Sequence, residues 1–133
     1  MSTFHLQIVT PDGLFFDGMA ESIFLRTIDG EIGILAGHTP LVTALGMGQA
    51  QVKVDGKIRK GACIGGMLSV TEKEVTVVAT TFEWAEDIDI PRAERSMLRA
   101  QKVLENRNSH SLDEIRLAEA RLKRALVRTS AGK

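Results

Sequence analysis

The sequence predicts an N-terminal antiparallel β-sandwich (a flattened barrel) followed by a C-terminal two-helix hairpin. Three observations indicate this β + α fold class. Apolar and polar residues alternate in the first part of the 133-residue chain, as in strands that are buried on one face. After Pro91 the apolar residues recur at helical spacing. The net charge also changes, from −4 over residues 1–86 (six Lys/Arg, ten Asp/Glu) to +4 over residues 87–133 (eleven and seven). We therefore expect a sandwich domain over residues 1–86 and a hairpin domain over residues 87–133.

The strands follow from the alternation and from the residues between the runs. Phe4, Leu6 and Ile8 alternate with polar residues. Asp55-Gly56 separates two alternating runs and suits a two-residue type I′ turn, which predicts a hairpin. Further apolar runs bounded by Gly, Asp and charged residues predict strands over 23–28, 32–35, 41–45, 67–70 and 75–80. Many short antiparallel strands over roughly residues 1–84 are typical of a sandwich or barrel.

Two helices are predicted after Pro91. Apolar residues recur at helical spacing over 93–104 and again over 115–125, separated by the polar stretch NRNSHS. Ser111 and Glu114 have capping-box spacing, so the second helix is expected to begin at Leu112. Both apolar stripes are narrow and rich in Ala, so arms of about fifteen residues bury little area and are only marginally stable alone. The hairpin therefore needs a surface to lie on and could leave it.

No catalytic or metal site is predicted. His5, His38 and His110 lack ligand-like spacing, and no nucleophile elbow, catalytic-cysteine signature or phosphate-cradling glycine loop is present. The lone Cys63 excludes an intrachain disulfide and is interpreted as a small buried filler. Trp84 and the five Phe are too few and too scattered to predict a base-stacking platform. No run approaches the ~20 apolar residues of a membrane span, so membrane association is expected only through a partner.

The helices carry two features with more than one interpretation. Asp89 and Pro91 suit the start of a helix, because Asp89 can accept hydrogen bonds from the first turn and Pro91 lacks a donor where none is needed. Arginines and lysines three or four residues apart form a ridge on each helix. They are Arg92, Arg95, Arg99 and Lys102, and Arg121, Arg124 and Arg128. These ridges are either a solvated face or a site for an acidic protein, a phosphate ligand or nucleic acid; the neutral overall charge disfavours nucleic acid.

Five sequence blocks together resemble the epsilon subunit of bacterial and chloroplast F-type ATP synthases. They are VTPDG (9–13), GEIGILAGHTPLV (30–42), GG (65–66), VTVVA (75–79) and AEDIDIPRA (85–93). The second block is the most specific, and the resemblance covers essentially the whole chain. It implies a noncatalytic subunit of the central rotor of a proton- or sodium-driven enzyme, peripheral to the cytoplasmic face of the bacterial cell membrane. A small enzyme and a nucleic-acid module remain as alternatives, to be tested by turnover and by salt-dependent binding.

The resemblance also implies partners. The sandwich would bind the gamma subunit and rest on the ring of c subunits, with Glu31 and His38 at these contacts. The hairpin would be compact on the sandwich or extended into the catalytic head. In the extended state its basic second helix, including Arg121 and Lys123, would meet acidic loops of the beta subunits and resist ATP hydrolysis.

Some members of the family bind ATP as a regulatory ligand on the compact form, and no other cofactor is implied. The positions of this chain that match their motif are Glu83, Ile88, Asp89, Arg92, Ala93, Arg99, Arg124 and Arg128. Two departures concern this site. Pro91 occupies a variable position of the motif, and the turn between the helices is slightly longer than in the ATP-binding relatives, which changes the expected register of Arg124 and Arg128 against the first helix.

Overall fold

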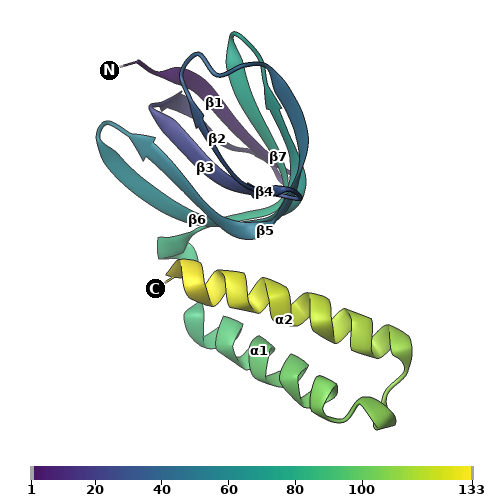
Figure 1. The fold of residues 1–133 in the computed structure, drawn as a ribbon. Coiled ribbons are helices and arrows are strands. Elements are labelled where there is room, and N and C mark those ends of the chain that lie inside the picture. Colours follow the sequence, from purple (N-terminus) through teal and green to yellow (C-terminus); the bar gives the residue numbers. More distant parts are fainter. Residues whose placement is uncertain (1, 133) are drawn as a thin grey trace.

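A computed structural model describes residues 2–132 and shows a sandwich with two helices below it (Figure 1). The strands are β1 (Phe4–Thr10), β2 (Gly13–Ala20), β3 (Ser22–Thr27), β4 (Gly30–Leu35), β5 (Leu41–Val54), β6 (Lys57–Val70) and β7 (Glu74–Trp84). A short 3₁₀ turn, η1 (Ala85–Asp87), leads into α1 (Ile90–Glu105), and η2 (Arg107–Ser109) connects α1 to α2 (Leu112–Gly132). The predicted fold class is confirmed.

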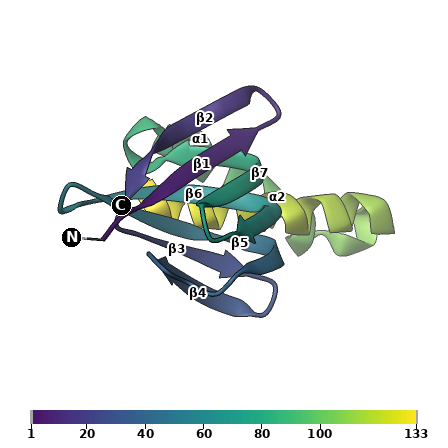
Figure 2. The same cartoon turned by 90° about the horizontal axis from the view of Figure 1, so that it is seen from above.

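The strands form one continuous hydrogen-bonded sheet in the order β2-β1-β7-β6-β5-β3-β4. The sheet folds over into two facing layers (Figure 2). Every neighbouring pair is antiparallel except β1 and β7, which are parallel. Strands β5 and β6 each have 14 residues, so the prediction of short strands is wrong for this pair. Strand β2 was not predicted.

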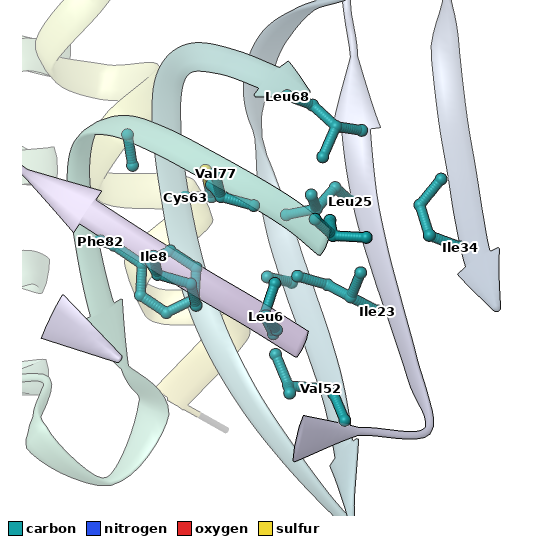
Figure 3. Close-up of a cluster of buried hydrophobic side chains, with 14 of the residues drawn as sticks. Leu6, Ile8, Ile23, Leu25, Ile34, Val52, Cys63, Leu68, Val77 and Phe82 are labelled. Atoms are coloured by element: carbon teal, nitrogen blue, oxygen red, sulfur yellow. The ribbon is translucent and has the colours of Figure 1, made fainter. Parts of the chain in front are cut away.

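The core lies between the two layers and consists of the side chains that alternation placed on one face (Figure 3). Leu6, Ile8, Val52 and Val77 have no exposed surface. Cys63 is also buried in this core, and burial raises the pKa of its thiol to about 12. The interpretation of Cys63 as a buried filler is therefore confirmed.

Four of the six aromatic residues, which are scattered along the sequence, meet at one end of the sandwich. Phe15, Phe16 and Phe82 pack with Trp84, with ring centroids between 5.2 and 5.9 Å apart. Trp84 is only 5% exposed. These rings stabilise the sandwich at the point where the chain leaves it for the helices, and they do not form an open stacking surface.

The turns and helix ends match their sequence signals. Asp55 and Gly56 have φ of 51° and 77° in the two-residue loop between β5 and β6, as a type I′ turn requires. The Asp89 carboxylate accepts a hydrogen bond of 3.1 Å from the Arg92 N–H and caps α1. The second helix begins at Leu112 as predicted, but its 21 residues exceed the expected arm length, whereas α1 has 16.

His5 joins three strands on the surface of the sandwich. Its Nε2 is hydrogen-bonded to Asp17 of β2, and its Nδ1 lies 3.3 Å from a carboxylate oxygen of Glu74 of β7. The hydrogen bond with Asp17, supported by the charges of both carboxylates, raises the pKa of His5.

This raised pKa predicts a pH-dependent stability. A group whose pKa is higher when folded contributes stability below its unfolded pKa and loses it as the pH rises through the folded value. Wild type should therefore exceed His5→Gln in melting temperature most below about pH 6, and the difference should shrink as the pH rises above the folded pKa. Thermal unfolding from pH 5.5 to 9 would measure it. A difference that does not vary with pH would contradict the interpretation.

Candidate functional site

The hairpin contacts the sandwich near the C-terminal end of α2 and the start of α1. Figure 1 shows α1 on the side of α2 away from the sheets, and Figure 2 shows the first turns of α2 extending past the edge of the sandwich. A small apolar cluster forms the contact: Ala62, Ile88 and Ala131 are buried, with Ile90 and Val127 packed against them. The contact is far smaller than the core of the sandwich, as expected of an element that can detach.

Polar contacts supplement this small cluster. The Arg128 Nε of α2 donates to Glu83 of β7 over 2.6 Å, and both side chains are about one third exposed. The Gln49 side chain of β5 donates to the Ser130 hydroxyl over 2.6 Å. These two bonds attach the end of α2 to two different strands.

The linker between the sandwich and α1 is held separately. Arg59 of β6 lies 4.0 Å from the centre of the Trp84 ring, and its Nε donates to Glu86 of η1 over 2.6 Å. The backbone N–H of Glu86 and the Arg59 guanidinium lower the pKa of the Glu86 carboxyl. Arg59 therefore helps to fix the position at which α1 begins, in addition to the apolar contacts of Ile88 and Ile90.

A cleft of about 340 Å³ opens where β7, the linker and both helices meet. Its lining contains seven of the eight residues expected to bind ATP. They are Glu83, Ile88, Asp89, Arg92, Ala93, Arg99 and Arg128, joined by Asp87 and Ser96. Arg124 is not among the lining residues and is partly exposed elsewhere on α2.

The lining of this cleft combines apolar and charged side chains. Ile88 and Ala93, which are 8% and 5% exposed, provide its apolar surface. Arg92 and Arg99 are exposed cations on the rim. Asp89 is engaged as the helix cap, which confirms the structural interpretation of this residue without excluding a ligand beside it. Arg128 already has Glu83 as its counterion.

A second cavity, of about 470 Å³, lies in the seam between α1 and α2. Its lining combines apolar and charged residues: Ser96, Arg99, Ala100, Val103, Glu114, Leu117, Ala118 and Arg121. Ser96 and Arg99 line both cavities. The sequence had assigned Arg121 to a protein partner, whereas the structure places it beside this seam. Lys123 is exposed on α2 and lines neither cavity.

The two residues expected at the rotor contacts do not lie together. Glu31 is the second residue of β4; it is exposed and borders an open groove of about 590 Å³ between the sheet and α2. His38 follows the other end of β4, in a turn where its backbone N–H donates to the Leu35 carbonyl over 3.2 Å. The structure therefore separates Glu31 and His38 by the length of β4.

Sequence reasoning missed an apolar row on the outer face of the sandwich. Leu14, Val9, Val78, Met67 and Ala44 are consecutive partners across strands β2, β1, β7, β6 and β5. Directly paired residues share one face of a sheet, and the largest of these side chains are 44% to 59% exposed. The apolar run at 77–79 is the signal that was available, because a strand with one solvent-exposed face would alternate there.

Residues 2–132 contain no group of three or more His, Cys, Asp or Glu side chains arranged to hold a metal ion. In the same residues, no helix is sufficiently long and apolar to cross a membrane.

Two domain models of one protein family match the chain. The beta-sandwich domain of the ATP synthase delta/epsilon chain matches residues 3–85, and the long alpha-helix domain of the same chain matches residues 86–133. The ATP synthase epsilon chain of Ruminococcus albus is 40% identical over 131 residues, which are 98% of this chain and 96% of that protein. The epsilon chain of Caldicellulosiruptor bescii is 43% identical over 128 residues, or 96% and 92% of the two chains.

Solved structures share the fold. A chain in the cryo-EM structure of Euglena gracilis mitochondrial ATP synthase, OSCP/F1/c-ring in rotational state 1, superposes with a TM-score of 0.86 at 22% identity, over 98% of this chain and 82% of that one. A chain of the Tetrahymena thermophila mitochondrial ATP synthase central stalk and c-ring gives 0.66 at 15% identity, over 99% and 98%. At these sequence identities the two structures support a shared fold and nothing beyond it.

Proposed function

The chain belongs to the ATP synthase delta/epsilon family, and from this premise we propose that it is a rotor subunit whose helical hairpin restrains ATP hydrolysis under the control of bound ATP. It is an epsilon subunit of the central stalk and is noncatalytic. In the proposal it is peripheral to the cytoplasmic face of a bacterial membrane, where it couples a proton- or sodium-driven c ring to ATP synthesis.

The outer apolar row is the surface that we assign to the gamma subunit. Val78, Met67 and Leu14 are the most exposed members of the row. Large exposed apolar side chains that adjoin across several strands are typical of protein interaction sites. A partner that covers this row would leave α2 free, because the helix packs elsewhere, against β5 and β6 near Ala62.

The rotor contacts of Glu31 and His38 are assigned to the two ends of β4. Glu31 and His38 lie near opposite ends of this strand, so a single partner would have to be broad to touch both. We therefore assign Glu31 and His38 to separate contacts, which accords with two rotor partners, gamma and the c ring. Which residue meets which partner would follow from cysteine crosslinking at each position in the assembled enzyme.

The hairpin is assigned as the regulator because its attachment is weak and local. The apolar contact comprises a few small side chains, and the Glu83–Arg128 pair is partly exposed to solvent. An exposed ion pair contributes at most about 1 kcal/mol. Detachment would free the basic α2, including Lys123 and Arg124, to meet acidic loops of the beta subunits.

The observation that carries the regulatory part is the cleft at the junction of β7, the linker and both helices. Glu83 comes from the sandwich, Ile88 from the linker, Arg92 from α1 and Arg128 from α2. The cleft exists only while the hairpin is compact, so its ligand would stabilise the compact state. At tenfold over Kd the stabilisation is about 1.4 kcal/mol, which would shift an evenly poised switch about tenfold.

Calorimetry with ATP on the isolated chain tests this proposal. The wild-type chain should bind ATP with measurable heat, and Arg92→Ala should weaken binding by about tenfold or more, because a charge-assisted donor on the rim is lost. Arg95→Ala is the matched control: Arg95 is an exposed arginine of α1 that does not line the cleft. Absence of heat at millimolar ATP, or equal affinities in the wild type and both variants, would contradict ATP binding in the cleft. The motif at residues 88–93 would then serve only as the cap of α1.

A further inference from the structure

The two cavities of the hairpin are two parts of one groove. Ser96 and Arg99 of α1 line both of them, so the cleft beside the sandwich continues into the seam between α1 and α2. Ala100 and Ala118, which are 3% exposed, face the seam and let the helices approach closely. A long ligand held at the cleft therefore has a continuous path toward Arg121.

The charges along this groove are not equivalent. Arg128, at the sandwich end, is neutralised by Glu83 at 2.6 Å. Among the residues that the structure describes, Arg99 and Arg121 have no carboxylate within ion-pair distance. Both are exposed, so their guanidinium groups can reorient toward a ligand. The unneutralised positive charge of the groove thus lies at Arg92, Arg99 and Arg121.

The Glu114 carboxylate disfavours an anion at the far end of the seam. Glu114 lines it, with one carboxylate oxygen 2.6 Å from the His110 Nδ1 and the other 3.2 Å from the Ser111 hydroxyl, which donates to it. Hydrogen bonds from His110 and Ser111 lower the pKa of Glu114, so this end carries a negative charge. Glu114 and Arg121 are seven residues apart, or about 10 Å along the helix. An anionic chain that enters from the cleft would therefore end near Arg121.

We infer that the seam receives the polyphosphate chain of the nucleotide, and that Arg121, rather than Arg124, contacts its terminal phosphate. This inference rests on the proposed binding of ATP to the compact hairpin. The base would lie against Ile88 and Ala93, the phosphates would pass Ser96 and Arg99, and the terminal phosphate would meet Arg121. Arg121 is then the residue that distinguishes a nucleoside triphosphate from a diphosphate, since a diphosphate held at the same base would end before reaching it.

Calorimetry with ATP and ADP on the full chain tests the assignment. Arg121→Ala should lose about tenfold or more in ATP affinity, as expected for a charge-assisted contact with phosphate, and should keep the wild-type affinity for ADP. Arg121→Lys should retain part of the preference for ATP, because the charge remains. Arg124→Ala and Arg95→Ala, at arginines that line neither cavity, should bind both nucleotides as wild type does. Melting temperatures without nucleotide check that each variant is folded.

The possible outcomes distinguish the assignment of Arg121 from the proposal that the compact hairpin binds ATP. Equal losses for ATP and ADP in Arg121→Ala, or no loss there together with a loss in Arg124→Ala, would overturn the assignment of Arg121 and leave regulatory ATP binding intact. A wild-type chain that binds neither nucleotide would overturn both. A selective loss of ATP affinity in Arg121→Ala would support the assignment.

Discussion

Ending the chain after Asp87 is expected to leave a folded sandwich that still assembles, while ATP hydrolysis by the assembled enzyme rises. The sandwich retains its entire main core and the bond between Arg59 and Glu86 that holds the linker. It loses the small cluster around Ala62 and the bonds of Glu83 and Gln49 to the end of α2. If half of the complexes carry the hairpin in the extended, inhibiting state, hydrolysis should rise about twofold, and by more if the extended fraction is larger. Steady-state hydrolysis by the reconstituted enzyme would measure it.

A second variant separates the charge of the hairpin from its presence. Lys123→Ala with Arg124→Ala removes two charges from α2 and leaves both cavities and the Glu83–Arg128 pair in place. Hydrolysis should change in the same direction as in the truncated chain if acidic loops of the beta subunits hold the extended state. Unchanged hydrolysis in the truncated enzyme would show that the helices do not inhibit.

Gly66→Ala should destabilise the sandwich more than any other single substitution considered for it. Gly66 has φ of +118°, and a Cβ there would collide with the Val78 carbonyl of the neighbouring strand and approach the backbone of Ala79. The strain of this backbone conformation and the backbone collision together should cost roughly 3–5 kcal/mol. For a domain of this size that is a large part of the total stability. Urea unfolding followed by circular dichroism would measure the loss.

Gly30→Ala is the matched control for this substitution. Gly30 has a similar φ of +124°, but a Cβ there has no heavy atom within 4 Å. Only the backbone strain of about 1–3 kcal/mol should remain. Equal losses in the two variants would show that the collision with the Val78 strand contributes little.

The sequence predicts best where a local chemical rule decides the structure. Asp55-Gly56 predicts its turn because few other residues tolerate φ > 0 at two successive positions. Asp89 predicts the start of α1 because its carboxylate can satisfy a free N–H of the first turn. In both places the deciding interaction spans a few residues, so no knowledge of the rest of the fold is required.

Strand β2 and the length of β6 depend on more than local rules. Strand β2 is an edge strand with a single buried residue, Ala20, so it has no alternation to detect. Gly65 and Gly66 resemble the end of a strand, yet they lie within β6, where positive φ accommodates a bend. The parallel pairing of β1 with β7 joins residues about seventy positions apart and has no local signal.

The candidate site was predicted only in part, because some of its residues are placed by local sequence and others by the packing of the two helices. The block AEDIDIPRA places Ile88, Asp89 and Ala93 on one linker and helix start, and the structure keeps them together. The arginines of α2 depend on how that helix packs against α1. One residue along a helix rotates a side chain by about 100°, so the register between the helices decides that Arg121, and not Arg124, borders the groove.

Amide hydrogen exchange of the full chain, with and without millimolar ATP, tests most directly the claim that ATP holds the hairpin compact. The two helices are only marginally stable when they are detached, so their amide hydrogens exchange when the hairpin leaves the sandwich. At tenfold over Kd, ATP should slow exchange in α1 and α2 about tenfold, leave the strands of the sandwich unchanged, and lose this effect in Arg92→Ala. Exchange in α1 and α2 that is the same with and without ATP would contradict the account.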